Sequence, residues 1–152
     1  VQIANDNSNG QLVISSKIKD LNLFKEILIS KKIKNIDLPV SAPFHSDLMS
    51  KATLIMQEEI KKLNFINSNI KLISNVTANE ITSIEELKNL LIKQIENRVR
   101  WRESVIHMIN QGVTQFIEIG PGKVLSGLIK RINRGIKVSA INSETDIENI
   151  IL

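Results

Sequence analysis

One histidine stands at a junction where proteins commonly place catalytic groups. The segment LPVSAPFHS, residues 38–46, sets His45 at the end of a short apolar run and just before a helix-like segment. In open α/β sheets, ligands bind at the carboxyl ends of strands. A neutral imidazole at such a place is suited to act as a general base. The alternative is a turn histidine whose ring is satisfied by backbone carbonyls, and the pattern alone leaves both interpretations open.

A general base needs a nucleophile, and the sequence offers none in a recognisable setting. Serine nucleophiles of α/β enzymes sit in a G-x-S-x-G turn, which exposes the hydroxyl and directs backbone amides at the oxyanion. No serine here has that surrounding; Ser8 lies in DNSNG and Ser126 lies in VLSGL. The chain has no cysteine and only two histidines, the other being His107. We therefore expect no thiol nucleophile, no disulfide framework and no metal site.

Two other segments have features of phosphate-binding sites. IEIGPGKVLSG, residues 117–127, reads as a strand, a glycine-rich turn and a helix. It lacks the spacing of a phosphate loop and also fails G-x-G-x-x-G, because Leu125 occupies the third glycine position. It is either a tight turn or a backbone element near an active site. A basic cluster of Lys31, Lys32 and Lys34 either holds phosphates or an acidic carrier, or is a solvated face.

Composition excludes several classes of protein. The chain has 152 residues, a net charge of +4 and a pI near 9.4, which suits one domain and mildly favours acidic partners. Aromatic residues make up 3%, too few for nucleic-acid stacking platforms. No apolar run approaches the roughly 20 residues of a membrane span, and no signal segment is evident. The chain opens with VQIA and no methionine, so we expect Val1 to lie inside a larger protein.

Strand and helix patterns alternate along the chain and predict an α/β fold. Strands at 1–5 and 11–16, a helix at 20–32 capped by Asp20 and a strand at 33–38 form a small α+β unit. The later pattern predicts a mostly parallel sheet after residue 39. Its helices are expected at 46–63, 84–95, 101–110, 123–132 and 144–151, and its strands at 70–76, 113–119 and 136–141.

Four segments together resemble the malonyl-CoA:acyl carrier protein transacylases of fatty acid biosynthesis. They are ANDNSNGQLVIS (4–15), LPVSAPFHSDLM (38–49), VRWRESV (99–105) and QGVTQFIEIGPGKVLSGLIKRI (111–132). They are collinear and cover nearly the whole chain, which corresponds to roughly the C-terminal half of such an enzyme. The resemblance implies that 1–38 ends a ferredoxin-like small subdomain. It implies that 39–152 forms the C-terminal part of an α/β-hydrolase-like large subdomain.

The family reaction implied by this resemblance is ping-pong. A serine takes malonyl from the CoA thioester and passes it to the phosphopantetheine thiol of acyl carrier protein, with a histidine as base and acid. The serine, the oxyanion amides and the arginine that pairs with the malonyl carboxylate belong to the N-terminal half. We therefore expect this chain alone to be inactive. The expected partners are malonyl-CoA, acyl carrier protein and the missing N-terminal half of the same protein, with no nucleic acid and no membrane. The expected compartment is the cytoplasm.

The resemblance also assigns roles to residues. His45 matches the family's histidine, and a backbone carbonyl near Arg100 matches the group that orients it. Four residues match positions on the CoA or pantetheine side: Asn5, Asn7, Gln11 and Lys34. Phe44 matches a further substrate-binding position, where a bulky side chain leaves no space for a branched acyl group. Asp6 replaces the family's usual aromatic residue, Asn9 its usual proline, and Ile33 a basic neighbour of Lys34, so the turn is expected to be looser and phosphate binding weaker. No metal or redox cofactor is implied, since malonyl-CoA and the phosphopantetheinyl carrier are substrates.

Three other functions remain in view. One is an acyltransferase domain of a polyketide synthase, in which a phenylalanine at the position of Phe44 accompanies a preference for malonyl. A second is a non-catalytic module that binds CoA or a carrier. A third is a basic nucleic-acid binder, whose affinity would fall steeply with salt.

Overall fold

The N-terminal strands form a hairpin. The structure is a computed structural model that describes residues 1–149. Strand β1 (Gln2–Ser8) pairs antiparallel with β2 (Gln11–Ser15). Between them Gly10 adopts a positive φ of 77°, which suits glycine because it has no Cβ. The two predicted strands and the turn between them are confirmed.

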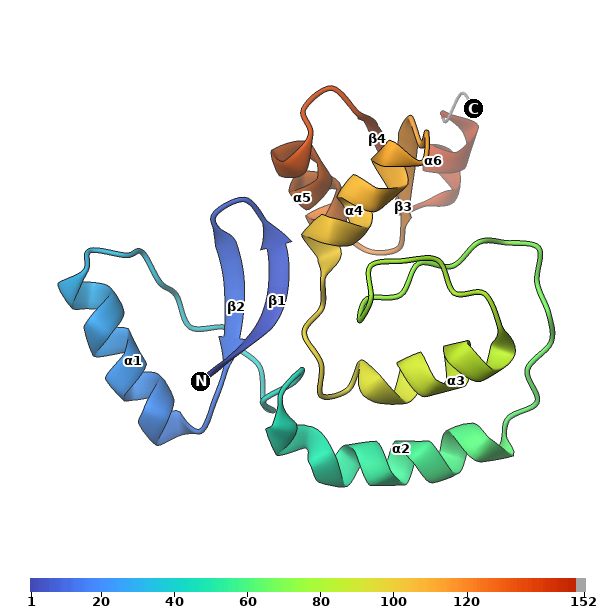
Figure 1. Ribbon diagram of the computed structural model, residues 1–152. Coiled ribbons are helices and arrows are strands. Elements are labelled where there is room, and N and C mark those ends of the chain that lie inside the picture. The colour runs from blue at the N-terminus through green and yellow to red at the C-terminus, as the bar shows by residue number, and fades with distance from the viewer. Residues whose placement is uncertain (150–152) are drawn as a thin grey trace.

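The helix after the hairpin stands apart from the rest of the fold, and the strand predicted after it is wrong. Figure 1 shows α1 (Ile18–Ser30) at one side of the hairpin. The helix begins after Lys17, so Asp20 lies in its first turn and is not its cap. The chain leaves the helix through Lys32 at a φ of 55°. Residues 33–38 then run without regular structure, and no neighbouring strand takes up their backbone groups. A strand needs such a neighbour, whatever its local sequence favours.

Two helices lie side by side in the middle of the chain (Figure 1). A short 3-10 helix, η1 (Asp47–Met49), leads into α2 (Ser50–Lys62), which packs on α3 (Ile84–Lys93). Ile60 of α2 and Leu90 of α3 are buried. The strand predicted at 70–76 is wrong, because only an isolated bridge between Ile73 and Glu80 forms there.

The C-terminal part contains the parallel pairing that the sequence predicts. Strand β3 (Gln115–Ile119) pairs parallel with β4 (Lys137–Ile141). The elements around them are α4 (Trp101–Asn110), α5 (Val124–Ile132) and α6 (Glu144–Glu148). The mixed α/β class is therefore confirmed. The last predicted helix extends to residue 151, and its residues 150 and 151 lie outside the described part of the chain.

The hydrophobic core lies between these helices and the parallel strands. Its buried centre is Val105, Ile129 and Ile136. Around this centre pack Trp101, Met108, Ile109, Phe116, Ile132 and Val138. Trp101, Val105, Met108 and Ile109 of α4 thus face the core, and their burial against α5 and β3 fixes the helix in place.

Backbone amides at the glycine-rich turn at 120–122 and at the start of α5 already have side-chain hydrogen-bond partners. The carboxylate of Glu118 accepts hydrogen bonds from the backbone amides of Leu125, at 3.1 Å, and Ser126, at 2.8 Å. The Gly122 amide donates to Asn142 Oδ1. These amides are the donors that a phosphate at the start of α5 would use. The structure therefore favours the tight-turn interpretation of GPGK.

The hairpin is tied to α4 by both backbone and side chains. Val99, just before α4, pairs in parallel with Asn5 on the edge of β1 away from β2. On the buried face of β1, the Asp6 carboxylate accepts hydrogen bonds from Arg102 Nε at 3.0 Å and Arg102 Nη2 at 2.8 Å. Residues 1–38 and 39–152 therefore share contacts, and their assignment to two subdomains stays a prediction. Within residues 1–149, none of the helices combines the length and the apolar character needed to cross a membrane.

The Asp6–Arg102 pair makes a prediction about stability and pH. The hydrogen bonds from Arg102 hold the pKa of Asp6 below its ordinary value, although burial opposes this shift. A carboxylate with a lowered folded-state pKa stabilises the fold above its unfolded pKa of about 3.9, and this contribution disappears as pH falls through the folded-state value. Urea unfolding of the protein and of Asp6→Asn should therefore show a stability difference of about 1–3 kcal/mol at pH 7. This difference should shrink below about pH 4. A difference that is constant from pH 7 to pH 2 would contradict the ionic nature of this contact.

Candidate active site

His45 lies at the C-terminal end of α3. Its backbone amide donates to the Ile95 carbonyl at 3.1 Å, and its ring Nδ1 lies 2.7 Å from the Gln94 carbonyl oxygen. Gln94 caps α3. The last carbonyls of a helix have no partner within the helix, so they are free to accept from other groups. The end of α3 therefore holds both the backbone and the ring of His45.

The Gln94 contact fixes the tautomer of the imidazole. A carbonyl oxygen only accepts hydrogen bonds, so Nδ1 must carry the proton that it shares with Gln94. In the neutral ring this leaves Nε2 with its lone pair, ready to accept a proton. His45 also has a φ of 58°, a left-handed conformation that is uncommon outside glycine. Backbone strain of this kind is found most often at functional sites.

The loop around His45 is fastened to the base of the hairpin. The Ser15 hydroxyl donates to the Phe44 carbonyl at 2.7 Å, and the Asp47 amide donates to Gln2 Oε1 at 3.0 Å. Within the loop, the buried Ser46 hydroxyl donates to the Pro43 carbonyl. The histidine is therefore held from the hairpin on one side and from α3 on the other. The side chain of Phe44 is left about half exposed.

The structure corrects the residue that orients the histidine. Sequence comparison placed the orienting carbonyl at Arg100, but the imidazole contacts Gln94. The backbone of Arg100 is used elsewhere, since its amide donates to Asn75 and its carbonyl accepts from Ser104. The physical reason is that the carbonyls of Gln94 and Ile95 follow the end of α3 and are open to His45, whereas the carbonyl of Arg100, the N-cap residue of α4, accepts the Ser104 amide of that helix. The predicted helix at 84–95 ends close to Gln94, but nothing in the sequence links this end to His45.

The predicted binding residues of β1 share one face of the strand. Ala4, Asp6 and Ser8 are buried, so Asn5 and Asn7 project from the opposite, half-exposed face. Arg102, the partner of Asp6, could not be found from the sequence, because the two residues lie far apart in the chain and no local pattern links them.

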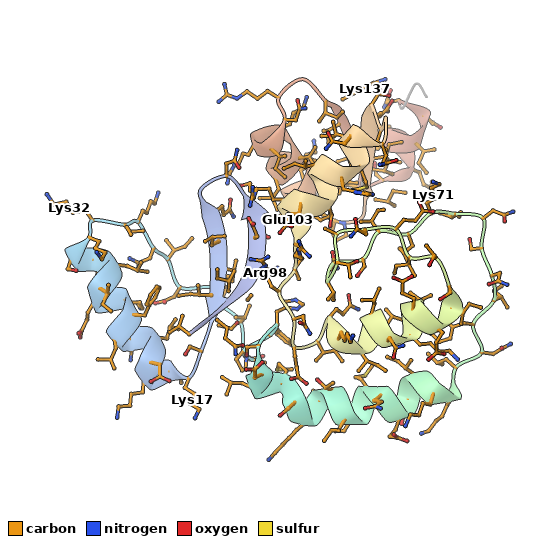
Figure 2. The ribbon with its side chains drawn as sticks, in the orientation of Figure 1. Lys17, Lys32, Lys71, Arg98, Glu103 and Lys137 are labelled. Atoms are coloured by element: carbon orange, nitrogen blue, oxygen red, sulfur yellow. The ribbon has the colours of Figure 1, made fainter. Side chains whose placement is uncertain are left out.

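The other two predicted binding residues before the histidine loop lie outside β1. Gln11 opens β2, and its Oε1 accepts a hydrogen bond from the Arg131 guanidinium on α5. Lys34 is exposed on the connection between α1 and the histidine loop, with Lys31 and Lys32 at the end of the helix. Figure 2 shows Lys32 projecting from the far end of α1, away from the hairpin. The roles of these residues stay predictions.

Curated proteins similar to this chain share one description. The chain is 43% identical over 149 residues to the malonyl CoA-acyl carrier protein transacylase of Bacillus subtilis, covering 97% of this chain and 47% of that protein. It is 37% identical over 151 residues to the protein of the same name from Staphylococcus aureus, covering 97% of this chain and 48% of that protein. No family model matches the sequence. As these coverages show, the chain spans about half the length of the curated relatives it matches.

Solved structures agree with this result. An acyl-carrier-protein S-malonyltransferase from Bartonella henselae superposes with a TM-score of 0.92 at 41% identity, covering 97% of this chain and 48% of that one. A malonyl-transacylase in complex with a type II polyketide acyl-carrier protein gives a TM-score of 0.93 at 32% identity, covering 97% of this chain and 48% of that one. The resemblance seen in the sequence motifs is confirmed: this chain is similar to malonyl CoA-acyl carrier protein transacylases over about half of their length.

Proposed function

We propose that this chain is the C-terminal half of an enzyme that moves malonyl from CoA to acyl carrier protein in fatty acid biosynthesis, in the cytoplasm. The observation that carries the proposal is the contact of His45 Nδ1 with the Gln94 carbonyl, which leaves Nε2 free to act as a base. The similarity to transacylases along 97% of the chain supports the choice of reaction. A neutral imidazole in one fixed tautomer is what a ping-pong acyl transfer requires.

In the first half of the proposed reaction, His45 acts as base and then as acid. Its Nε2 takes the proton of a serine hydroxyl as the serine oxygen forms a bond to the malonyl carbonyl carbon. The Gln94 carbonyl dipole stabilises the resulting imidazolium through the Nδ1–H donor. The carbon–sulfur bond then breaks, and the imidazolium gives its proton to the departing CoA thiolate. Malonyl remains on the serine as an ester.

The second half reverses these steps on a different thiol. His45 takes the proton of the phosphopantetheine thiol, whose sulfur attacks the malonyl ester. The carbon–oxygen bond breaks, and the proton returns to the serine oxygen. Asn5, Asn7 and Gln11 are proposed to border the pantetheine arm, Lys34 to approach the CoA phosphates and Phe44 to restrict the acyl group.

The other half of the protein is proposed to supply the serine and to cover apolar surface left open here. Helix α1 has no buried residue. On α2, Leu54, Ile55 and Met56 are exposed, and Ile119 at the end of β3 is 79% exposed. Monomeric proteins rarely leave apolar surface of this extent open. These faces are suited to pack against the half of the relatives that this chain does not span.

A second candidate differs in the carrier and keeps the same chemistry. One matching structure is named as a malonyl-transacylase bound to a type II polyketide acyl-carrier protein, at 32% identity. A polyketide carrier is therefore the alternative acceptor for this chain. Transfer rates to the two kinds of carrier, measured side by side with one enzyme preparation, distinguish these candidates.

Replacing His45 should strongly slow malonyl transfer in the natural full-length protein that contains this sequence. His45→Gln keeps an amide that can donate to Gln94 but cannot act as base, so kcat should fall by about 10²–10⁴-fold. Transfer of radiolabelled malonyl from CoA to acyl carrier protein measures this. The matched control is His107→Gln on α4, which should retain the unmodified rate. Equal rates for both variants would contradict the role of His45.

The isolated chain of residues 1–152 should show no transfer at all. It contains no serine in a G-x-S-x-G turn, so no covalent intermediate can form. Intact-mass measurement after incubation with malonyl-CoA should show an unmodified chain, whereas the full-length protein should gain one malonyl group. A malonyl ester on a serine of the isolated chain would contradict this account. Binding of CoA by a full-length protein that transfers nothing would favour a non-catalytic binding module.

A further inference from the structure

A cluster of five charged side chains lies between β1 and α4. Arg98 contacts Glu103 at 3.3 Å, Arg100 also pairs with Glu103, and Arg102 contacts Asp6 at 2.8 Å. Figure 2 shows Arg98 and Glu103 close together where the chain passes β1 and enters α4. Three guanidinium groups and two carboxylates thus surround the point where α4 begins. Most of these contacts join neighbours in the chain, but Asp6–Arg102 joins segments far apart in sequence.

The Asp6–Arg102 contact has the geometry of a strong pair. Arg102 presents Nε and Nη2 to the two oxygens of the carboxylate, at 3.0 and 2.8 Å. Bidentate pairing of this kind fixes orientation as well as distance. The Asp6 side chain is 8% exposed, so water competes little for it. The pair therefore holds the middle of β1 against the first turn of α4.

The same stretch of β1 is held by backbone hydrogen bonds. The Asp6 amide donates to the Val99 carbonyl at 2.9 Å, and the Val99 amide donates to the Ala4 carbonyl at 2.8 Å. Residues 94 and 95, which hold His45, lie only a few positions before Val99. These hydrogen bonds therefore join β1, which carries Asn5 and Asn7, to the segment that carries Gln94, the partner of His45. The junction lies next to the Asp6–Arg102 contact.

We propose that Arg102 is a positioning residue: through Asp6 it fixes β1 against the 94–99 segment, so that Asn5 and Asn7 stand in register with His45. This inference rests on the proposed function. Asp6 and Arg102 occupy the buried side of β1, so they do not touch substrate. Their effect reaches the substrate through the position of the two asparagines on the opposite face. Loss of the pair should weaken substrate binding more than the chemical step.

The test uses the natural full-length protein with two variants and a control. Arg102→Met leaves the Asp6 carboxylate buried without its partner, whereas the double variant Asp6→Asn with Arg102→Met removes both charges and avoids that cost. The control is Arg134→Met, an exposed arginine in the turn between α5 and β4. In both test variants the KM for malonyl-CoA or acyl carrier protein should rise about tenfold, with kcat within about twofold of the parent. The control should keep both constants.

Hydrogen exchange gives a second readout that does not depend on activity. In the double variant the amides of Asp6 and Val99 should exchange at least about tenfold faster, while those of β3 and β4 keep their rates. An unchanged KM with unchanged exchange at Asp6 and Val99 would overturn the proposal. A fall in kcat alone, in proportion to the loss of folded protein, would also overturn it.

The two proposals fail in different ways. If the unmodified full-length protein transfers no malonyl to either carrier, the proposed function is wrong. Exchange at Asp6 and Val99 then decides the positioning role alone: local acceleration in the double variant supports it, and uniform rates refute it.

Discussion

The carbonyl oxygens at the end of α3 are the constraint on which the site depends. The C-cap residue Gln94 and Ile95, in the turn that follows α3, have carbonyls outside the helix ladder, and these take up the ring and the backbone amide of His45. The hydrogen bond to Gln94 sets the tautomer, and the bond to Ile95 fixes the strained backbone from which the ring projects. A backbone carbonyl thus does the orienting work that a carboxylate performs in a Ser-His-Asp triad. The acceptor carries no full charge, so it orients the ring without adding a buried anion.

The surrounding elements serve to hold this arrangement. The hairpin fastens the histidine loop through Ser15 and Gln2, and Val99 fastens the hairpin to the chain that leaves α3. The core formed by α4, α5 and the parallel strands anchors the start of α4, where Arg102 reaches back to Asp6. Burial of the core residues therefore fixes the start of α4, and the Arg102–Asp6 contact carries that position to β1. The apolar side chains left exposed on α1 and α2 are the surfaces that the proposed other half would cover.

Local patterns in the sequence predicted most helices and the strands that find partners. The apolar spacing of α4 and α5, and the turn residues between β1 and β2, specify these elements without help from elsewhere. The predictions at 33–38 and 70–76 failed because a strand exists only where another strand pairs with it, and local sequence does not reveal this. The histidine was found from its place after an apolar run. Its acceptor, Gln94, and the Asp6–Arg102 pair depend on tertiary contacts between distant segments, so neither could be read from one stretch of sequence.

The central claim is that Gln94 holds the His45 ring with its proton on Nδ1. Long-range ¹H–¹⁵N correlation spectra of the ring nitrogens, recorded on the natural full-length protein with the imidazole neutral, test this directly. His45→Gln identifies the signal by its disappearance, and His107 supplies an internal comparison. The account predicts that the His45 proton resides on Nδ1 and that Nε2 is unprotonated. A ring protonated on Nε2, or one that exchanges freely between both tautomers, would contradict it.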